Sequence, residues 1–158
     1  MKKVLVSAVI AAGLMAGAGT AMSGEAEDKA IKARQAVMQL LAFNLGKLGA
    51  MVKGDMAYDA KQAQMAADNL KAVASIRQDA MWPMGTAMED SGMQGKTWAK
   101  KAAWDTYPAV VKKHEAMVMA ADKMAAAAGG GVDAVKGAIG AVGGSCKGCH
   151  EDFRAPRN

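Results

Sequence analysis

Aromatic side chains are scarce in this sequence, and it has neither a long basic run nor a long strand-like alternation. Phe, Trp and Tyr make up 4% of the 158 residues, whereas hydrophobic residues make up 52%. Ala, Met, Leu and Val must therefore supply the core, and Ala, Leu and Met lose little on entering a helix. Without a cluster of Lys and Arg, nothing argues for nucleic-acid binding. The chain is expected to be all-α with a single core.

The N-terminal stretch has the pattern of a secretory signal. Lys2 and Lys3 precede an apolar run at 4–18, and small residues offer cleavage positions near Ala21 to Ser23. The run is shorter than the roughly 20 residues that a membrane-spanning helix needs, so cleavage is expected rather than anchoring. The predicted domains are a signal peptide at 1–22 and one exported domain at 23–158, in the periplasm and without membrane insertion.

Four helical stretches are predicted, at 27–53, 59–80, 97–128 and 132–153. Thr97 is a candidate N-cap, and Pro108 is expected to interrupt the third helix. Apolar residues that recur at spacings of three and four form a seam along each helix, and this seam is expected to face the core. These residues are Ile31, Met38, Leu41, Leu45, Leu48 and Val52, then Met65, Leu70, Val73 and Ile76, then Val132, Val135, Ile139, Val142, Cys146, Cys149 and Phe153. Such helices predict an antiparallel four-helix bundle.

Both cysteines and one of the two histidines lie in the motif CKGCH at 146–150. Cys-x-x-Cys-His is the attachment signal of a c-type haem. Cys146 and Cys149 would each add to one vinyl group of the porphyrin, and His150 would then reach the iron as proximal ligand. Five glycines between 137 and 148 would give a flat macrocycle clearance against this helix.

Three other interpretations of the motif remain open. A disulfide between the two cysteines would close a very short loop. A thioredoxin-type redox pair needs a βαβ context, which the pattern does not show. Zinc usually takes four ligands, and the cluster offers three.

The chain resembles the class II c-type cytochromes, above all cytochrome c′. The marks are CKGCHEDFR near the C-terminus, RQAVM in the first helix, WPMGT in the long connection, and KTWAKKAAW entering the third helix. The resemblance covers essentially the whole sequence after the signal. It implies a left-handed four-helix bundle with one covalently attached haem c.

The resemblance also implies roles for individual residues around the haem. Arg34 and Gln35 match a pair that reaches the haem propionates, which would explain why a charge interrupts the apolar seam of the first helix. Thr97 matches a threonine near the haem edge, and Trp98 stands where the family usually has a glutamate. Arg154 matches a basic residue near the proximal face.

Met38 lies one helical turn after Arg34, where the resemblance places the side chain that covers the distal face of the iron. A thioether is both a core-filling group and an iron ligand. An apolar cover would leave the iron five-coordinate, whereas in low-spin relatives a methionine of the first helix is the sixth ligand. His114, near the apolar side of the third helix, is interpreted as a boundary residue without a ligand role.

The expected function is that of a periplasmic, cytochrome c′-like c-type cytochrome. It would act in electron transfer or in the binding of NO and CO at a five-coordinate iron. The alternative is a low-spin electron carrier with His150 and Met38 both on the iron, and a third hypothesis is an exported methionine-rich copper(I) binder without haem.

The sequence shows no catalytic constellation, so no enzymatic activity is expected. The expected partners are redox proteins and small gases. A homodimer through the first two helices is a further expectation, which follows from the resemblance.

Overall fold

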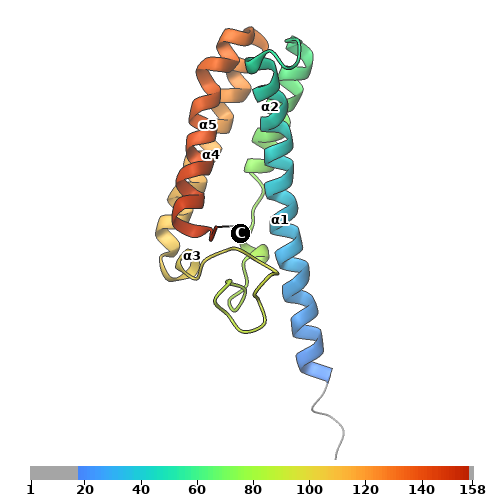
Figure 1. Cartoon of the computed structure of the whole chain (residues 1–158), viewed down its shortest axis with the longest axis vertical. Helices are drawn as coiled ribbons and strands as arrows, with labels where there is room; N and C mark the ends of the chain where they lie inside the picture. Colours follow the sequence, from blue (N-terminus) through green and yellow to red (C-terminus); the bar gives the residue numbers. More distant parts are fainter. Residues whose placement is uncertain (1–17, 157–158) are drawn as a thin grey trace, which may run out of the picture.

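The computed structural model describes the backbone of residues 18–156 and the side chains of residues 24–156. Four long helices run alternately up and down the molecule (Figure 1). They are α1 (Ala18–Lys53), α2 (Ala60–Ala74), α4 (Tyr107–Ala127) and α5 (Val132–Phe153), joined by the short helices η1 (Asp79–Met81), α3 (Ala102–Asp105) and η2 (Ala128–Gly130). No strand occurs in this part of the chain, so the predicted all-α, antiparallel four-helix bundle is confirmed.

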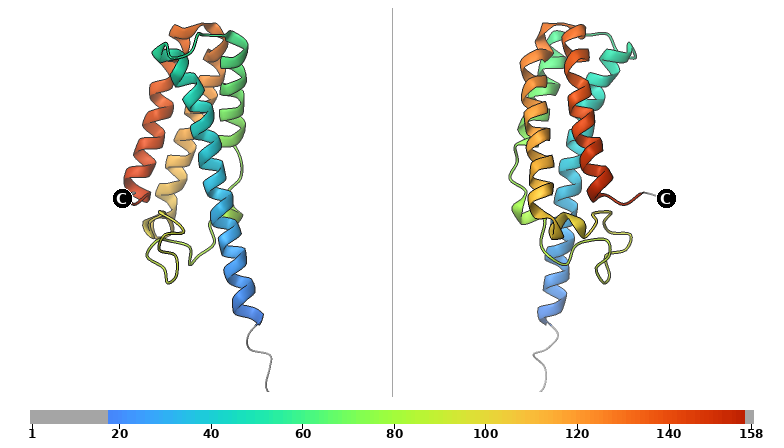
Figure 2. Two further views of the ribbon diagram at one scale, coloured as in Figure 1. Left: turned by 45° about the vertical axis from the view of Figure 1, so that its right-hand side comes forward. Right: turned by 90° about the vertical axis from the view of Figure 1, so that its left-hand side faces the viewer.

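Each long helix packs against its neighbours in the sequence, and α5 closes the ring by packing against α1. Figure 2 shows that the long connection after α2 lies beneath one end of the bundle, at the end where α5 terminates. The connection and the C-terminal segment are bonded to each other there. The backbone N–H of Lys100 donates to the carbonyl of Phe153 at 2.9 Å, and that of Ala155 donates to the carbonyl of Trp98 at 2.8 Å.

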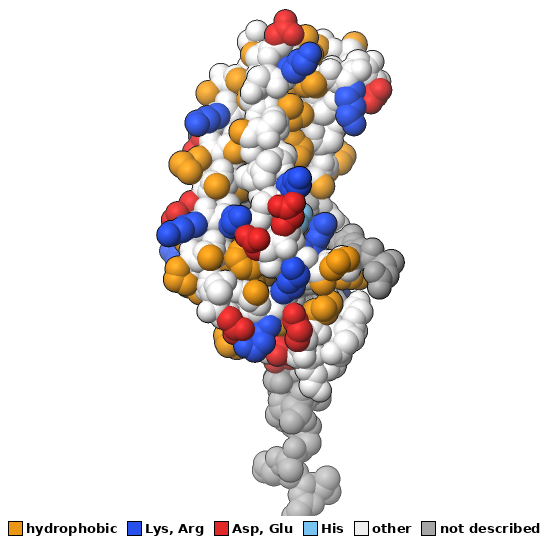
Figure 3. Space-filling model, turned by 60° about the vertical axis from the view of Figure 1, so that its left-hand side comes forward, with side chains coloured by type: hydrophobic (Ala, Val, Ile, Leu, Met, Phe, Trp, Pro, Cys, Tyr) orange, Lys and Arg blue, Asp and Glu red, His pale blue; other side chains and the backbone are white. Residues whose placement is uncertain are grey.

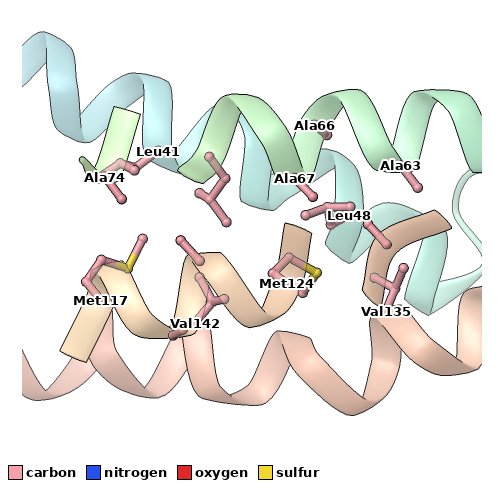
Figure 4. Packing of buried hydrophobic residues seen from close by; sticks show 14 of the residues in the cluster. Leu41, Leu48, Ala63, Ala66, Ala67, Ala74, Met117, Met124, Val135 and Val142 are labelled. Atoms are coloured by element: carbon pink, nitrogen blue, oxygen red, sulfur yellow. The ribbon is translucent and has the colours of Figure 1, made fainter. Parts of the chain in front are cut away.

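The core lies between the two helix pairs, and Figure 4 shows the buried side chains of α1 and α2 facing those of α4 and α5. Leu48 and Leu70 are fully buried, and each such side chain contributes about 1.5–3 kcal/mol relative to leaving it exposed. On α2 most of the buried residues are alanines, namely Ala63, Ala66, Ala67 and Ala74. Because alanine is small, α2 can pack closely on its neighbours.

The predicted apolar seam of α5 is confirmed except for Val132 and Cys149, which are half-buried and lie outside the core cluster. Val135, Val142 and Phe153 are buried, and Ile139 and Cys146 pack against the core. In α1, the predicted residues Leu41 and Leu48 are buried, and so is the charged Arg34.

Two predicted core residues of the second helix are wrong. Met65 is 53% exposed and Ile76 is 38% exposed. The buried face of α2 consists of the alanines instead, and this helix ends at Ala74 rather than near residue 80. A pattern that follows the large apolar residues misses a face made of alanine, because alanine occurs on both sides of a helix.

The predicted start of the third helix is also wrong. Thr97 caps no helix, because its hydroxyl accepts hydrogen bonds from Arg34 and from the backbone N–H of Ala99. Regular helix begins only at Ala102, breaks at Thr106 and resumes with Pro108 in the first turn of α4. The predicted interruption at Pro108 is thus confirmed.

The predicted signal peptide at 1–22 lies largely outside the described residues, which begin at 18. Among the helices of the described chain, none combines the length and apolar character that would let it cross a membrane. Four of the five glycines of α5 named above are exposed, and Gly148 is half-buried.

Candidate haem-binding site

The last turns of α5 carry the CKGCH motif. Cys146 and Cys149 are both free thiols and both half-buried. Cys146 packs against the core, with its Sγ 3.9 Å from Sδ of Met117. Residues three apart on a helix have Cβ atoms about 5–6 Å apart, which is wider than the roughly 3.8 Å of a disulfide. The helical geometry therefore disfavours the disulfide interpretation and presents both thiols on one side of α5.

The surroundings of the thiols also disfavour a reactive redox pair. Burial raises the pKa of Cys146, and its hydrogen bond with Ser145 lowers the pKa only in part. Burial raises the pKa of Cys149 as well, against a smaller opposite effect of Lys113. Reactive redox cysteines have a lowered pKa instead. Over the described residues, no group of three His, Cys, Asp or Glu side chains could hold a metal ion.

Arg34 of α1 lies at the same end of the bundle and is 3% exposed. Its Nη1 donates to Oγ1 of Thr86 at 2.8 Å, and its Nη2 donates to the carbonyl of Thr86 at 2.7 Å and to Oγ1 of Thr97 at 2.8 Å. A weaker bond joins Nη1 to the carbonyl of Met81 at 3.4 Å. One side chain of α1 therefore holds three points of the long connection.

Two tryptophans enclose the same guanidinium. Its Cζ lies 4.7 Å from the ring centroid of Trp82 and 5.6 Å from that of Trp104. The two rings are 5.6 Å apart and tilted by 58°, and Nε1 of Trp104 donates to the carbonyl of Trp82 at 3.1 Å. Such cation–π contacts stabilise a desolvated arginine.

Arg34 has no carboxylate within 4 Å among the side chains that the structure describes. Burial accordingly lowers its pKa to about 10. A buried cation without an anionic partner is costly, and an anion beside it removes most of that cost. The site therefore suits a ligand with carboxylates, such as the propionates of a haem.

Of the other predicted residues, one lies beside Arg34 and two lie near the C-terminal segment. Gln35 lies beside Arg34 and donates from Nε2 to the carbonyl of Lys96 at 2.8 Å, so it also holds the long connection. Trp98 is half-buried and Arg154 is exposed, and each lies where the connection meets the C-terminal segment. The structure thus brings Arg34, Gln35 and Thr97 together.

Met38 and His150 come from α1 and α5, two helices that pack against each other. Met38 lies on α1, one turn after Arg34, and is 38% exposed. It does not pack into the protein core as the seam predicted, because Val37 takes the buried position beside it. His150 is half-buried on α5, directly after Cys149.

Sequence reasoning missed Thr86, which is fully buried and bonds to Arg34 through both its hydroxyl and its carbonyl. It also missed Trp82, Trp104 and Lys113. Thr86 and Trp82 lie in the WPMGT motif, and Trp104 lies in KTWAKKAAW. Both motifs had been noted in the sequence, but the roles of these three residues follow only from their contacts with Arg34.

The residues present fit a covalent haem c. Two thiols three residues apart on one helix can carry both thioether bonds, and the adjacent imidazole can hold the iron. On α1, Arg34 offers a buried positive charge for the propionates.

Comparisons with known proteins agree with this site. The family model described as "Cytochrome C'" matches residues 29–154. A cytochrome c′ of Cereibacter sphaeroides is 36% identical over 157 residues, which covers 99% of this chain and 100% of that protein. A cytochrome c-554 of the same species is 38% identical over 127 residues, or 80% of this chain and 93% of that protein.

Solved structures show the same fold. Cytochrome c′ from Rhodobacter sphaeroides has a TM-score of 0.78 at 35% identity, with 83% of this chain and 98% of that chain covered. A nitric oxide complex of a cytochrome c′ mutant from Alcaligenes xylosoxidans has a TM-score of 0.69 at 30% identity, with 82% and 97% covered. A cytochrome c′ with ligand-controlled dimer dissociation has a TM-score of 0.74 at 34% identity, with 82% and 97% covered.

Cytochrome c′ is itself a standard example of this helix bundle, so the fold adds no independent support to the family match. The match of the sequence, over nearly the whole described chain, is enough to assign the family without the fold. Proteins of this family bind one covalent haem c. The chain belongs to the cytochrome c′ family.

Proposed function

We propose that this chain is a periplasmic c-type cytochrome that binds NO or CO at a five-coordinate iron and can also transfer electrons. Cys146 and Cys149 carry the haem, and His150 is the proximal ligand. The observation that carries the proposal is the pair of free thiols on the last turns of α5, directly before a half-buried histidine. The haem supplies an iron that changes oxidation state and binds diatomic gases.

The chain's own residues hold and enclose that group. Arg34 offers its guanidinium to the propionates, and Thr86, Thr97 and Trp82 keep the guanidinium in place. Gln35 fixes the connection next to it. These contacts would orient the haem and reduce its exposure to water at that end of the bundle.

Met38 would cover the distal face without binding the iron. An apolar cover admits an uncharged diatomic and disfavours anions, which would lose hydration without gaining hydrogen bonds. A solved relative with nitric oxide bound supports gas binding by proteins of this fold. The second candidate is a low-spin electron carrier with Met38 as sixth ligand, which the position of Met38 one turn after Arg34 also permits.

Two copies of the chain are proposed to pair through α1 and α2. Both helices carry exposed large apolar side chains, among them Leu40, Phe43 and Met65. A solved relative shows ligand-controlled dimer dissociation, which supports a dimer that gas binding would influence.

The test is an absorption spectrum together with an intact mass. The mature protein, produced in a host with haem-attachment machinery, should have the mass of the polypeptide plus one haem. The reduced protein should have a high-spin spectrum that changes on adding CO. A low-spin spectrum that CO leaves unchanged would support the His150/Met38 alternative, and a colourless protein without added mass would disprove the haem proposal. Recovery in a periplasmic extract, with the N-terminus near residue 23, would test export.

A further inference from the structure

Lys113 of α4 reaches across to the haem-attachment segment of α5. Its Nζ lies 2.9 Å from Oδ2 of Asp152. The same atom would be 3.5 Å from a Cβ at Gly148, one of the two residues between the cysteines. The ammonium therefore lies beside the CKGCH turn and close to Cys149, and its partner Asp152 lies two residues after His150.

This ion pair differs from the others on the same face. The pair Lys147–Glu151 lies within α5 and is more exposed, at 76% and 61%. The side chains of Lys113 and Asp152 are 38% and 52% exposed and belong to different helices. Figure 3 shows acidic and basic side chains interspersed on the face of α4 and α5, with no separate patch of one sign. The charges there balance one another locally.

We propose that Lys113 and Asp152 set the reduction potential of the bound haem through their opposite charges. The inference rests on the proposed function, because it requires haem on Cys146 and Cys149. The oxidised iron carries one more positive charge than the reduced iron. The ammonium of Lys113 therefore favours the reduced state, and the carboxylate of Asp152 favours the oxidised state.

The two charges largely cancel while both are present. Removing one leaves the other uncompensated beside the haem-attachment turn of α5. The two single substitutions should thus act in opposite directions. A clamp that only holds α4 against α5 would be broken equally by either substitution, and both would act in the same direction.

The experiment is a spectroelectrochemical titration of the haem-loaded protein and its variants. Lys113→Met should decrease the equilibrium constant for reduction about threefold to tenfold, which lowers the potential by about 28 to 59 mV for one electron. Asp152→Asn should raise it by a similar amount. The double variant should return close to the original potential, and Lys113→Arg should leave it nearly unchanged.

A matched control uses the ion pair between Lys71 of α2 and Asp122 of α4, at 3.1 Å. It joins two helices as well, but Asp122 lies nine residues further along α4 than Lys113, about 13.5 Å away. Lys71→Met and Asp122→Asn should not change the potential.

The outcomes separate this inference from the proposed function. If the unsubstituted protein carries no haem, the proposed function and the inference both fail. If it carries haem and the two single variants shift the potential in the same direction, or not at all, only the inference fails. Loss of haem from both single variants, with haem retained in the control variants, would show a structural clamp and would also overturn the inference.

Discussion

Arg34 makes most of the side-chain contacts that hold the long connection at the haem end of the bundle, the end where α5 terminates. Its guanidinium bonds to Thr86, Thr97 and the carbonyl of Met81, and it lies against two tryptophans. A charged residue in an apolar seam would destabilise an isolated helix bundle. Here it links α1 to a connection that has little regular structure, and it holds that connection at more points than any other side chain of α1 described above.

Replacing Arg34 with methionine should lower the free energy of unfolding by about 2 to 4 kcal/mol, because hydrogen bonds from a charged donor are lost and their acceptors stay buried. Urea unfolding of the haem-loaded protein, followed by circular dichroism, measures this loss. The control is Lys32→Met, at an exposed position on the same helix, which should change stability by less than about 0.5 kcal/mol. Equal effects of both substitutions would contradict a special role for Arg34.

Met38 distinguishes the two coordination states. In the five-coordinate protein, Met38→Ala should leave the high-spin spectrum unchanged and should speed CO association, because a smaller side chain covers the distal face. In the six-coordinate alternative, the same substitution removes a ligand and converts a low-spin spectrum to a high-spin one. Flash photolysis of the CO complex and the absorption spectrum together decide between them, and a CO association rate that stays the same would contradict the distal placement.

The residues of the candidate haem site were predictable to different degrees. Cys146, Cys149 and His150 form a short motif that is typical of haem attachment, so the sequence alone was enough to propose them. Thr86 was missed, because a threonine gives no signal of a bond to a residue 52 positions earlier. Its role depends on tertiary contacts alone.

At the scale of elements, regular helices were predictable and the long connection was not. The seam of α5 repeats without a break, and the structure confirms most of it. The stretch from Ser75 to Lys101 holds only a short helix, η1, and is kept in place by Arg34 and Gln35 and by backbone bonds to the C-terminal segment. Local pattern cannot reveal such long-range bonds, so the second and third helices were predicted too long.

The glycines of α5 lead to a stability prediction. Gly137 is exposed within the helix, with nothing within 4 Å of a Cβ placed there. Gly137→Ala should therefore raise the free energy of unfolding by up to about 1 kcal/mol. Gly131, just before α5, has φ of +113°, so Gly131→Ala should lower stability by about 1 to 3 kcal/mol. Chemical denaturation of both variants tests this, and a stabilising Gly131→Ala would contradict the strain argument.

At the scale of the whole molecule, the ends of the bundle are fastened by different means. At the end opposite the haem site, the hydroxyl of Tyr58 donates to the carbonyl of Ala128 at 2.8 Å and accepts from the N–H of Gly131 at 3.0 Å. One side chain thereby joins the turn after α1 to the turn between α4 and α5. The haem end is closed by the long connection and the C-terminal segment instead.

The proposed dimer gives a prediction for the assembled protein. Phe43 is 62% exposed on α1, with Nζ of Lys47 5.2 Å from its ring centroid. Phe43→Glu should raise the dissociation constant of the dimer about tenfold to a hundredfold, because burial of a phenylalanine contributes about 1.5–3 kcal/mol. Sedimentation velocity over a range of concentrations measures this. Met119→Glu, at a 59% exposed position on α4, is the matched control, and an equal effect of both would place the interface elsewhere.

The three anchor points of Arg34 limit how parts of related bundles could be exchanged. A connection transplanted from another protein would have to bring a buried threonine at position 86 and another at 97, with the backbone of residue 86 turned toward α1. A graft without them would leave guanidinium donors facing apolar surroundings. Chimeras of this chain should therefore tolerate a new loop only when residue 34 is exchanged together with it.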